Sequence, residues 1–192
     1  MNNPFRLEGN RVVLRDWRDS DLAEFARLNA DAEARRYFPT VLTREASDLE
    51  AGRARQRAID DGFTFWPVEI PGVTEFAGFT GLLRTSFEAH FTPCVEIGWR
   101  FLPAFWGKGY ASEAARLALA YGFESLNLDE IVALTTVSNQ PSRKVMERIG
   151  MTRTEEDDFD HPRIEAGHPL RRHVLYRLKR DDWLRQQAPN GA

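Results

Sequence analysis

Hydrophobic and polar positions follow two periods along the chain, and together they predict a mixture of strands and helices. Stretches rich in β-branched and aromatic residues, such as RVVLRDW and EIVALTTV, predict strands. Apolar residues at helical spacing, or a run of alanines, predict helices, because alanine is the strongest helix former. Strands are predicted at residues 11–17, 63–70, 76–85, 94–101, 130–137 and 173–180, and helices at 19–28, 43–61, 109–126 and 141–149.

The order of these elements predicts an α/β domain of the mixed, α+β kind. No internal repeat, linker or low-complexity tract divides the sequence, so we expect residues 1–192 to form one domain, with an ordered core at about 11–180. A frayed tail is expected at residues 186–192. The acidic and polar stretch at residues 155–172 is expected to be a long loop, either functional or simply solvated.

The composition of the chain excludes several classes of protein. It has 192 residues and a net charge of −3, which argues against a general nucleic-acid binder. No apolar run approaches the ~18 residues of a membrane span, and the first residues lack the pattern of a signal peptide. A single cysteine and four histidines without close spacing predict neither an intrachain disulfide nor a metal site. We therefore expect a cytoplasmic monomer or homodimer without membrane or nucleic-acid partners.

A Gly-Lys-Gly triplet in the stretch FLPAFWGKGYASEAARLALAYGF is the first sign of chemistry. It meets neither the P-loop pattern nor the dinucleotide fingerprint, since Ser112 stands where the latter needs its third glycine. Small residues at the start of a helix nevertheless favour an anion, because the free N–H groups and the positive end of the helix dipole point there. The alternative is a strand-to-helix turn whose glycines serve only the backbone shape.

The wider context of the triplet carries a resemblance to a known family. WGKGYASEA, preceded by VEIGWRFLPAF and followed by VSNQPSRKVMERIGM, resembles the GNAT superfamily of acyl-CoA-dependent N-acetyltransferases, and most of all its ribosomal-protein N-terminal acetyltransferases. The resemblance covers residues 11–180 and is strongest from Val95 to Met151. It implies a mixed, strongly twisted β-sheet flanked by helices. The family's usual first loop residue, glutamine or arginine, is replaced here by Trp106.

The same resemblance implies acetyl-CoA as the co-substrate and no metal. Backbone N–H groups in the turn would hold its pyrophosphate, and Lys108 would either assist or remain a solvated loop lysine. The strand ending at Phe101 and Leu102 would pair with the pantetheine arm, and an N–H near Phe101 would stabilise the thioester oxyanion. The coenzyme-binding set is expected to be Phe101, Leu102, Trp106, Gly107, Lys108, Gly109, Tyr110, Ala111, Asn139 and Ser142.

The chemistry requires a neutral amine, so a base is expected near the thioester. Glu96 is the leading candidate, because strand alternation places it opposite Val95 and Ile97, on the face shared with Arg100. The alternative is a strand carboxylate that pairs with Arg100 or another cation. His90 is the second candidate, from its suitable intrinsic pKa, although a lone loop histidine is more often incidental.

Two polar residues near the later helix complete the expected site. Asn139 either caps that helix or, as the resemblance implies, also bonds the pantetheine arm. Ser142 either is an ordinary first-turn serine or protonates the departing thiolate, whereas Tyr110 is poorly placed for that role. Cys94 is expected to be a packing residue, so the amine attacks directly in a ternary complex.

The acceptor is the least specified part of the reaction. Tyr37, Phe38, Phe65 and Trp66 are expected to lie in the core or in the acceptor wall, and Asp157, Asp158 and Asp160 either attract a cationic amine or form a solvated loop. We expect acetyl transfer to a primary amine, of either a protein N-terminus or a small molecule. The alternatives are a non-catalytic acyl-CoA-binding or sensor module and, less favoured, an enzyme that uses Lys108 on a nucleotide phosphate.

Overall fold

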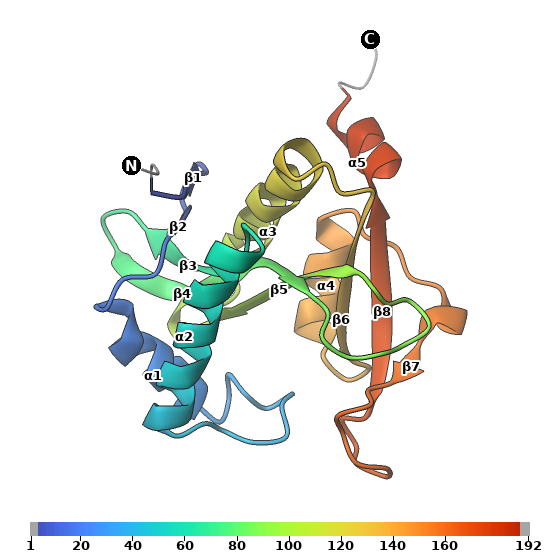
Figure 1. Cartoon of the computed structure of the whole chain (residues 1–192), viewed down its shortest axis with the longest axis horizontal. Helices are drawn as coiled ribbons and strands as arrows, with labels where there is room; N and C mark the ends of the chain where they lie inside the picture. The colour runs from blue at the N-terminus through green and yellow to red at the C-terminus, as the bar shows by residue number, and fades with distance from the viewer. Residues whose placement is uncertain (1–3, 189–192) are drawn as a thin grey trace.

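The computed structural model describes residues 4–188 of the chain. Eight strands form a sheet in the order β1-β2-β3-β4-β5-β6-β8-β7 (Figure 1). The strands are β1 (Arg6–Glu8), β2 (Val13–Arg15), β3 (Phe65–Ile70), β4 (Thr74–Arg84), β5 (Val95–Phe101), β6 (Glu130–Thr136), β7 (Phe159–Asp160) and β8 (Arg172–Lys179). The helices are α1 (Asp21–Ala30), α2 (Arg44–Asp60), α3 (Tyr110–Ala120), α4 (Gln140–Arg148) and α5 (Arg180–Gln187), with short turns of helix at Pro103–Phe105, Tyr121–Ser125 and Glu155–Asp157.

The sheet splits in the middle, between its two parallel neighbours. β4 and β5 pair along seven positions, from Gly78↔Phe101 to Arg84↔Val95. β5 and β6 pair only at Glu96↔Val132. The two halves of the sheet separate beyond that point, as Figure 1 shows between β5 and β6. The C-terminal half of β5 therefore keeps one edge free of strand pairing.

Helices cover both faces of the sheet, and two of the three apolar clusters in the core of residues 4–188 lie on opposite faces of β5. Residues of α3, α4 and α5 pack with alternate strand residues into the larger cluster, which includes Ile97, Ala115, Met146 and Trp183. On the opposite face, α1 and α2 lie side by side and pack on β4, with Phe79 in a smaller cluster (Figure 1). This division gives each side of β5 a different environment.

A buried ion pair connects β2 to the start of α1. The guanidinium of Arg15 donates to both carboxylate oxygens of Asp21 at 2.7 and 2.8 Å, and both side chains are almost fully buried. Arg15 also donates to Glu69 of β3 at 3.0 Å. Two carboxylates thus compensate this buried cation, as the burial of a charge requires.

Each predicted strand and helix is present, with ends that differ by a few residues, but besides the short helical turns at Pro103–Phe105 and Glu155–Asp157 three elements were not predicted. These are the edge strands β1 and β7, which are short, and the helix α5. In α5 only Trp183 is buried, so its charged sequence shows almost no apolar period. The predicted 109–126 helix is α3 followed by a π turn at Tyr121–Ser125.

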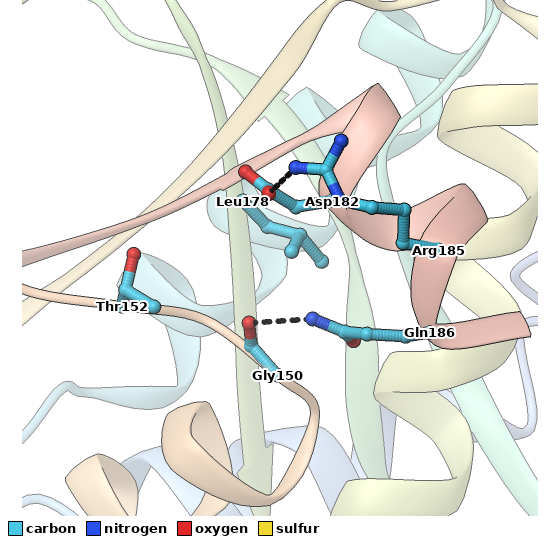
Figure 2. A pocket seen from close by; sticks show the side chains of 6 residues that line it. All are labelled: Gly150, Thr152, Leu178, Asp182, Arg185 and Gln186. Atoms are coloured by element: carbon cyan, nitrogen blue, oxygen red, sulfur yellow. Dashed lines mark hydrogen bonds and ion pairs between the residues drawn. The ribbon is translucent and has the colours of Figure 1, made fainter.

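The C-terminal helix packs back on the turn that follows α4. Gln186 donates from Nε2 to the carbonyl oxygen of Gly150 at 3.1 Å, beside a hollow of about 410 Å³ (Figure 2). The tail predicted to fray from residue 186 therefore begins inside α5, whose last residue is Gln187, and its residues 189–192 lie outside the described part of the chain.

Candidate active site

The turn between β5 and α3 is built around two glycines with left-handed backbone. Gly107 has a φ of 73° and Gly109 a φ of 84°, which residues with a Cβ rarely adopt. Gly109 is the N-cap of α3. The Gly-Lys-Gly triplet thus does require glycine for its shape, and the shape directs the backbone toward the helix N-terminus.

This turn presents a row of free donors. Glu113 donates its N–H to the carbonyl oxygen of Gly109 at 3.1 Å, which closes the first turn of α3. The N–H groups of residues 107–112 donate to no other group in residues 4–188. Free N–H groups at the start of a helix form a binding site for phosphate or another anion, which the helix dipole reinforces.

Side-chain contacts of Arg11 support the turn. Arg11 donates from Nη1 to the carbonyl oxygen of Lys108 at 3.0 Å and from Nε to Glu113 at 2.8 Å. Its guanidinium lies 5.0 Å from the ring centre of Tyr110. Lys108 itself is exposed and donates from Nζ to the carbonyl oxygen of Ala104 at 2.9 Å. In this arrangement Arg11 supports the turn, and Lys108 folds back on the preceding residues.

Trp106 fixes the turn to the end of β5. Its indole Nε1 donates to the carbonyl oxygen of Phe101 at 2.7 Å, while 39% of the residue remains exposed. The side chain that replaces the family's usual glutamine or arginine therefore has a partner within the protein.

The free edge of β5 carries the backbone of Phe101. Leu102 donates its N–H to the carbonyl oxygen of Ala77 on β4 at 2.9 Å. Backbone groups alternate between the two edges of an antiparallel strand, so the N–H of Phe101 points away from β4, toward the gap beside β6. Leu102 has no free N–H, and its side chain is buried beneath α1.

Glu96 faces the side of the sheet opposite the larger core cluster. Val95 and Ile97 are buried in that cluster, and Glu96 is partly buried on the other face. Among the described side chains it has no hydrogen-bond or ion-pair partner within bonding distance. Burial without a compensating cation raises the pKa of Glu96 to about 7.

The predicted alternative, a Glu96–Arg100 pair, is absent from the described structure, and its absence has a steric cause. Gly98 lies between the two residues on the same face of β5, and the ring of Phe65 covers it so closely that an added Cβ would lie 2.8 Å from Phe65 Cζ. Arg100 instead donates from Nη1 to Asn29 Oδ1 at 2.7 Å. Glu96 and Arg100 thus lie on either side of an aromatic ring.

Asn139 and Ser142 lie across the split, where β6 leads into α4. Asn139 caps α4 by accepting from the N–H of Ser142 at 3.3 Å, and its Nδ2 donates to Thr135 Oγ1 at 2.8 Å. The hydroxyl of Ser142 is half-buried and has no hydrogen-bond partner within the described chain. Asn139 is therefore the cap of α4, as one of the two predicted roles requires, and the Ser142 hydroxyl is available to bond a ligand.

The other titratable candidates lie in local networks. His90 is exposed and contacts Asp157 at 3.2 Å, and Asp157 also accepts from Arg177 at 2.8 Å. Asp158 pairs with Arg153, and Asp160 with the arginines at 171 and 172. All three aspartates are thus paired within the protein. In residues 4–188 no group of three His, Cys, Asp or Glu side chains could hold a metal ion, and no helix is long and apolar enough to cross a membrane.

The remaining predicted residues divide between core and surface. Trp66 is buried and stacks on Phe5 at 4.2 Å, and Phe65 stacks on Phe79 at 5.4 Å. Tyr37 and Phe38 lie in the segment between α1 and α2, where Phe38 is 42% exposed. Cys94 contacts Thr85 Oγ1 at 2.9 Å, and burial raises the pKa of its thiol, as suits a packing residue.

Sequence reasoning missed Arg11 and Arg100 as parts of this site. Arg11 supports the turn from 97 positions away in the chain, and Arg100 considered alone is only a polar residue on an alternating strand. Their roles depend on tertiary contacts, for which a single sequence offers no signal.

A comparison of the sequence with known proteins finds a matching family and several similar proteins. A family model described as an acetyltransferase (GNAT) domain matches residues 11–152. The chain is 41% identical over 174 residues to the uncharacterized N-acetyltransferase YnaD of Bacillus subtilis, covering 90% of this chain and 96% of that protein. It is also 41% identical over 103 residues to FsC-acetyl coenzyme A-N(2)-transacetylase of Aspergillus fumigatus, covering 52% of this chain. The chain spans only 42% of the length of that fungal relative.

Solved structures share the fold. A GNAT-family acetyltransferase from Bacillus anthracis matches with a TM-score of 0.76 and 29% identity, covering 92% of this chain and 99% of that one. Mycobacterium smegmatis RimJ in complex with CoA-disulfide matches with a TM-score of 0.72 and 21% identity, covering 94% of this chain and 87% of that one. These likenesses confirm the predicted mixed sheet flanked by helices.

Proposed function

Because the chain belongs to the GNAT family of acetyltransferases, we propose that it transfers an acetyl group from acetyl-CoA to a primary amine. The observation that carries this proposal is the row of free N–H groups at residues 107–112, placed directly beside the unpaired edge of β5. The N–H groups suit a pyrophosphate, and the strand edge suits an extended chain with amide groups. Coenzyme A contains both.

The turn and the strand divide the binding of coenzyme A. N–H groups of residues 107–112 bind the pyrophosphate, with the left-handed glycines exposing them and Arg11 holding the turn. The free edge of β5 pairs with the amide groups of the pantetheine arm, as an added strand would. Asn139 and Ser142 face the arm from the α4 side of the split. The side chain of Trp106 acts on the turn through Phe101 and needs no direct bond to phosphate.

The thioester supplies an activated acetyl group, which passes to a neutral amine as the coenzyme departs as a thiol. Glu96 accepts the proton of the incoming ammonium, directly or through a water, and a pKa of about 7 suits that task near neutral pH. The N–H of Phe101 donates to the carbonyl oxygen as negative charge develops there. Ser142 donates its hydroxyl proton to the departing sulfur and regains a proton from the attacking nitrogen as the amide forms, so the thiol leaves neutral and the serine is restored. Burial raises the pKa of the Cys94 thiol and so disfavours a nucleophilic thiolate, which supports direct transfer to the amine without an acyl-cysteine intermediate.

The names of the related proteins point to more than one kind of acceptor. The fungal relative is named for transfer to the N(2) position of FsC, and one solved structure that shares the fold is named a ribosomal-protein-S5-alanine acetyltransferase. The reaction type is common to both. The proposal therefore specifies a primary amine, and the identity of the acceptor is a separate question.

A screen with acetyl-CoA and a panel of amines tests this function. The panel contains amino acids, polyamines and peptides with free N-termini, and two readouts are taken: release of the coenzyme thiol and the mass of the product. Transfer to an amine supports the proposal. If calorimetry shows that acetyl-CoA binds while no amine in the panel is acetylated, the alternative of a non-catalytic acyl-CoA-binding module takes its place.

A further inference from the structure

A pair of arginines, Arg100 and Arg35, lies beside the candidate active site, and no ion-pair partner for either lies in the described residues 4–188. Arg100 is on the same face of β5 as Glu96 and directly precedes Phe101. Arg35 lies in the segment between α1 and α2 and is only 7% exposed. Both guanidinium groups converge on a single neutral atom, Asn29 Oδ1, at 2.7 Å from Arg100 and 3.2 Å from Arg35.

The other contacts of these two arginines are also neutral. The guanidinium of Arg100 lies over the rings of Phe38 at 4.6 Å and Phe79 at 5.0 Å. Arg35 donates from Nε to the carbonyl oxygen of Thr40 at 2.6 Å. In residues 4–188 no carboxylate lies within ion-pair distance, 4.0 Å, of either guanidinium, and Glu50 on α2 acts on both only through space.

This neutral surrounding is costly for the protein. Burial, together with the neighbouring Arg35, lowers the pKa of Arg100 to about 9. Arg100 Nε is buried and finds no hydrogen-bond partner in the part of the chain that the structure describes. A cation held in this way is normally balanced by an acid, as Arg15 is balanced by Asp21 and Glu69 in this same chain.

Arg100 and Arg35 lie where they can contact an acceptor bound beside Glu96. Glu96 and Arg100 occupy one face of β5, on either side of the Phe65 ring, and the N–H of Phe101 follows at once. Glu96 and Arg100 are each only partly buried, and Phe38, which lies against Arg100, is 42% exposed, so solvent reaches this face. Arg100 directly adjoins Phe101, so an amine held near the N–H of Phe101 would lie close to the Arg100 side of this face. A guanidinium with free N–H groups is suited to bind a carboxylate through two parallel hydrogen bonds.

We propose that the acceptor is an amine that also carries a carboxylate, and that Arg100 and Arg35 bind this carboxylate while the amine faces Glu96 and Phe101. This inference rests on the proposed acetyl transfer and narrows its acceptor to one chemical class. The carboxylate has two possible sources, the α-carboxylate of a free amino acid or an acidic side chain at the start of a peptide.

Matched acceptors test the proposal without any substitution in the protein. The panel pairs free amino acids with their carboxamides, and a tripeptide amide that begins with glutamate with one that begins with glutamine. We expect a preference in kcat/KM of about 10- to 100-fold for the carboxylate member of one kind of pair, the effect of hydrogen bonds to a charged group. The kind of pair that shows it identifies the source of the carboxylate.

Substitution of the arginine then assigns the preference to a residue. Arg100→Met, which keeps the stem against Phe38 and Phe79, is expected to lower kcat/KM for the carboxylate acceptor by about 10- to 100-fold. Its effect on the uncharged partner should stay within about twofold, a difference that misfolding would not produce. Arg36→Met is the matched control, since Arg36 is exposed, pairs with Glu33 and is expected to leave the preference unchanged.

The possible results distinguish a failure of the carboxylate preference from a failure of acetyl transfer itself. Turnover of amines with no carboxylate preference in the wild-type protein overturns the inference and leaves acetyl transfer standing. A preference that survives Arg100→Met unchanged also overturns it, because another group then reads the carboxylate. Absence of turnover with every amine removes the proposed function and this inference with it.

Discussion

The indole Nε1 of Trp106 donates a 2.7 Å hydrogen bond to the carbonyl oxygen of Phe101, which joins the anion-binding turn to the strand beside it. The bond holds two parts of the proposed coenzyme site in one arrangement. Trp106→Phe keeps an aromatic side chain and removes the donor. We expect acetyl-CoA affinity to fall about 3- to 10-fold, the value of one hydrogen bond, as measured by calorimetry. Unchanged affinity would show that the turn keeps its place without this bond.

Gly109 tests the shape of the turn. Gly109→Ala forces a Cβ into a left-handed conformation at φ 84° and brings that atom to 3.3 Å from Arg11 Nη2. We expect the strain, about 1–2 kcal/mol, to move the turn and weaken acetyl-CoA binding by about 10-fold.

A second glycine serves as the control for that substitution. Gly52 lies in α2, and a Cβ added there meets no atom of residues 4–188 within 4 Å. Gly52→Ala should leave coenzyme binding unchanged and stabilise the protein by about 1 kcal/mol in thermal unfolding. Equal coenzyme affinity in the two alanine variants would contradict the role of the turn.

Glu96 is expected to set the pH dependence of catalysis. With a pKa of about 7, it is protonated in acid and gains its ability to accept a proton as the pH rises through 7. Glu96→Gln should lower kcat/KM at pH 8 by about 10²- to 10⁴-fold and remove the break near pH 7 from the profile. A variant that keeps full activity at every pH would show that another group, such as His90 or a water chain, is the base.

The same residue makes a prediction about stability. Its pKa is 4.5 in the unfolded chain and about 7 in the folded protein, so between these values the folded state binds more protons. Stability from this group is present below pH 4.5 and is lost as the pH rises through 7. Relative to wild type, Glu96→Gln should therefore gain up to about 3 kcal/mol of unfolding free energy between pH 4.5 and 8. Denaturant titrations at both pH values measure it, and a pH-independent difference would argue against the raised pKa.

Much of this fold could be predicted because its central elements have strong periods. The alternation in VEIGWRF correctly placed Val95 and Ile97 in the core and Glu96 on the other face. The alanine-rich sequence of α3 and the Pro141 to Gly150 boundaries of α4 were equally informative. Short edge strands and the charged helix α5 escaped prediction, because they acquire their stability from packing on elements distant in the chain.

The candidate site could be predicted only where its residues are close in sequence. The turn at residues 107–111 and the cap at Asn139 follow from local rules. The support of the turn by Arg11 and the meeting of Arg100 with Arg35 over Asn29 depend on residues that the fold alone brings together. The arginines that pair with Asp157, Asp158 and Asp160 could not be predicted for the same reason. The three aspartates therefore form ion pairs, where the sequence predicted free acidic side chains.

Acetyl transfer itself is the central claim, and one assay tests it most directly. Wild-type protein is incubated with acetyl-CoA and the amine panel from pH 5 to 9, and both the coenzyme thiol and the acetylated amine are quantified. We predict equal amounts of the two products with at least one amine, formed at a rate that rises through pH 7 as Glu96 loses its proton. Tight binding of acetyl-CoA with no acetylated amine at any pH would contradict the account.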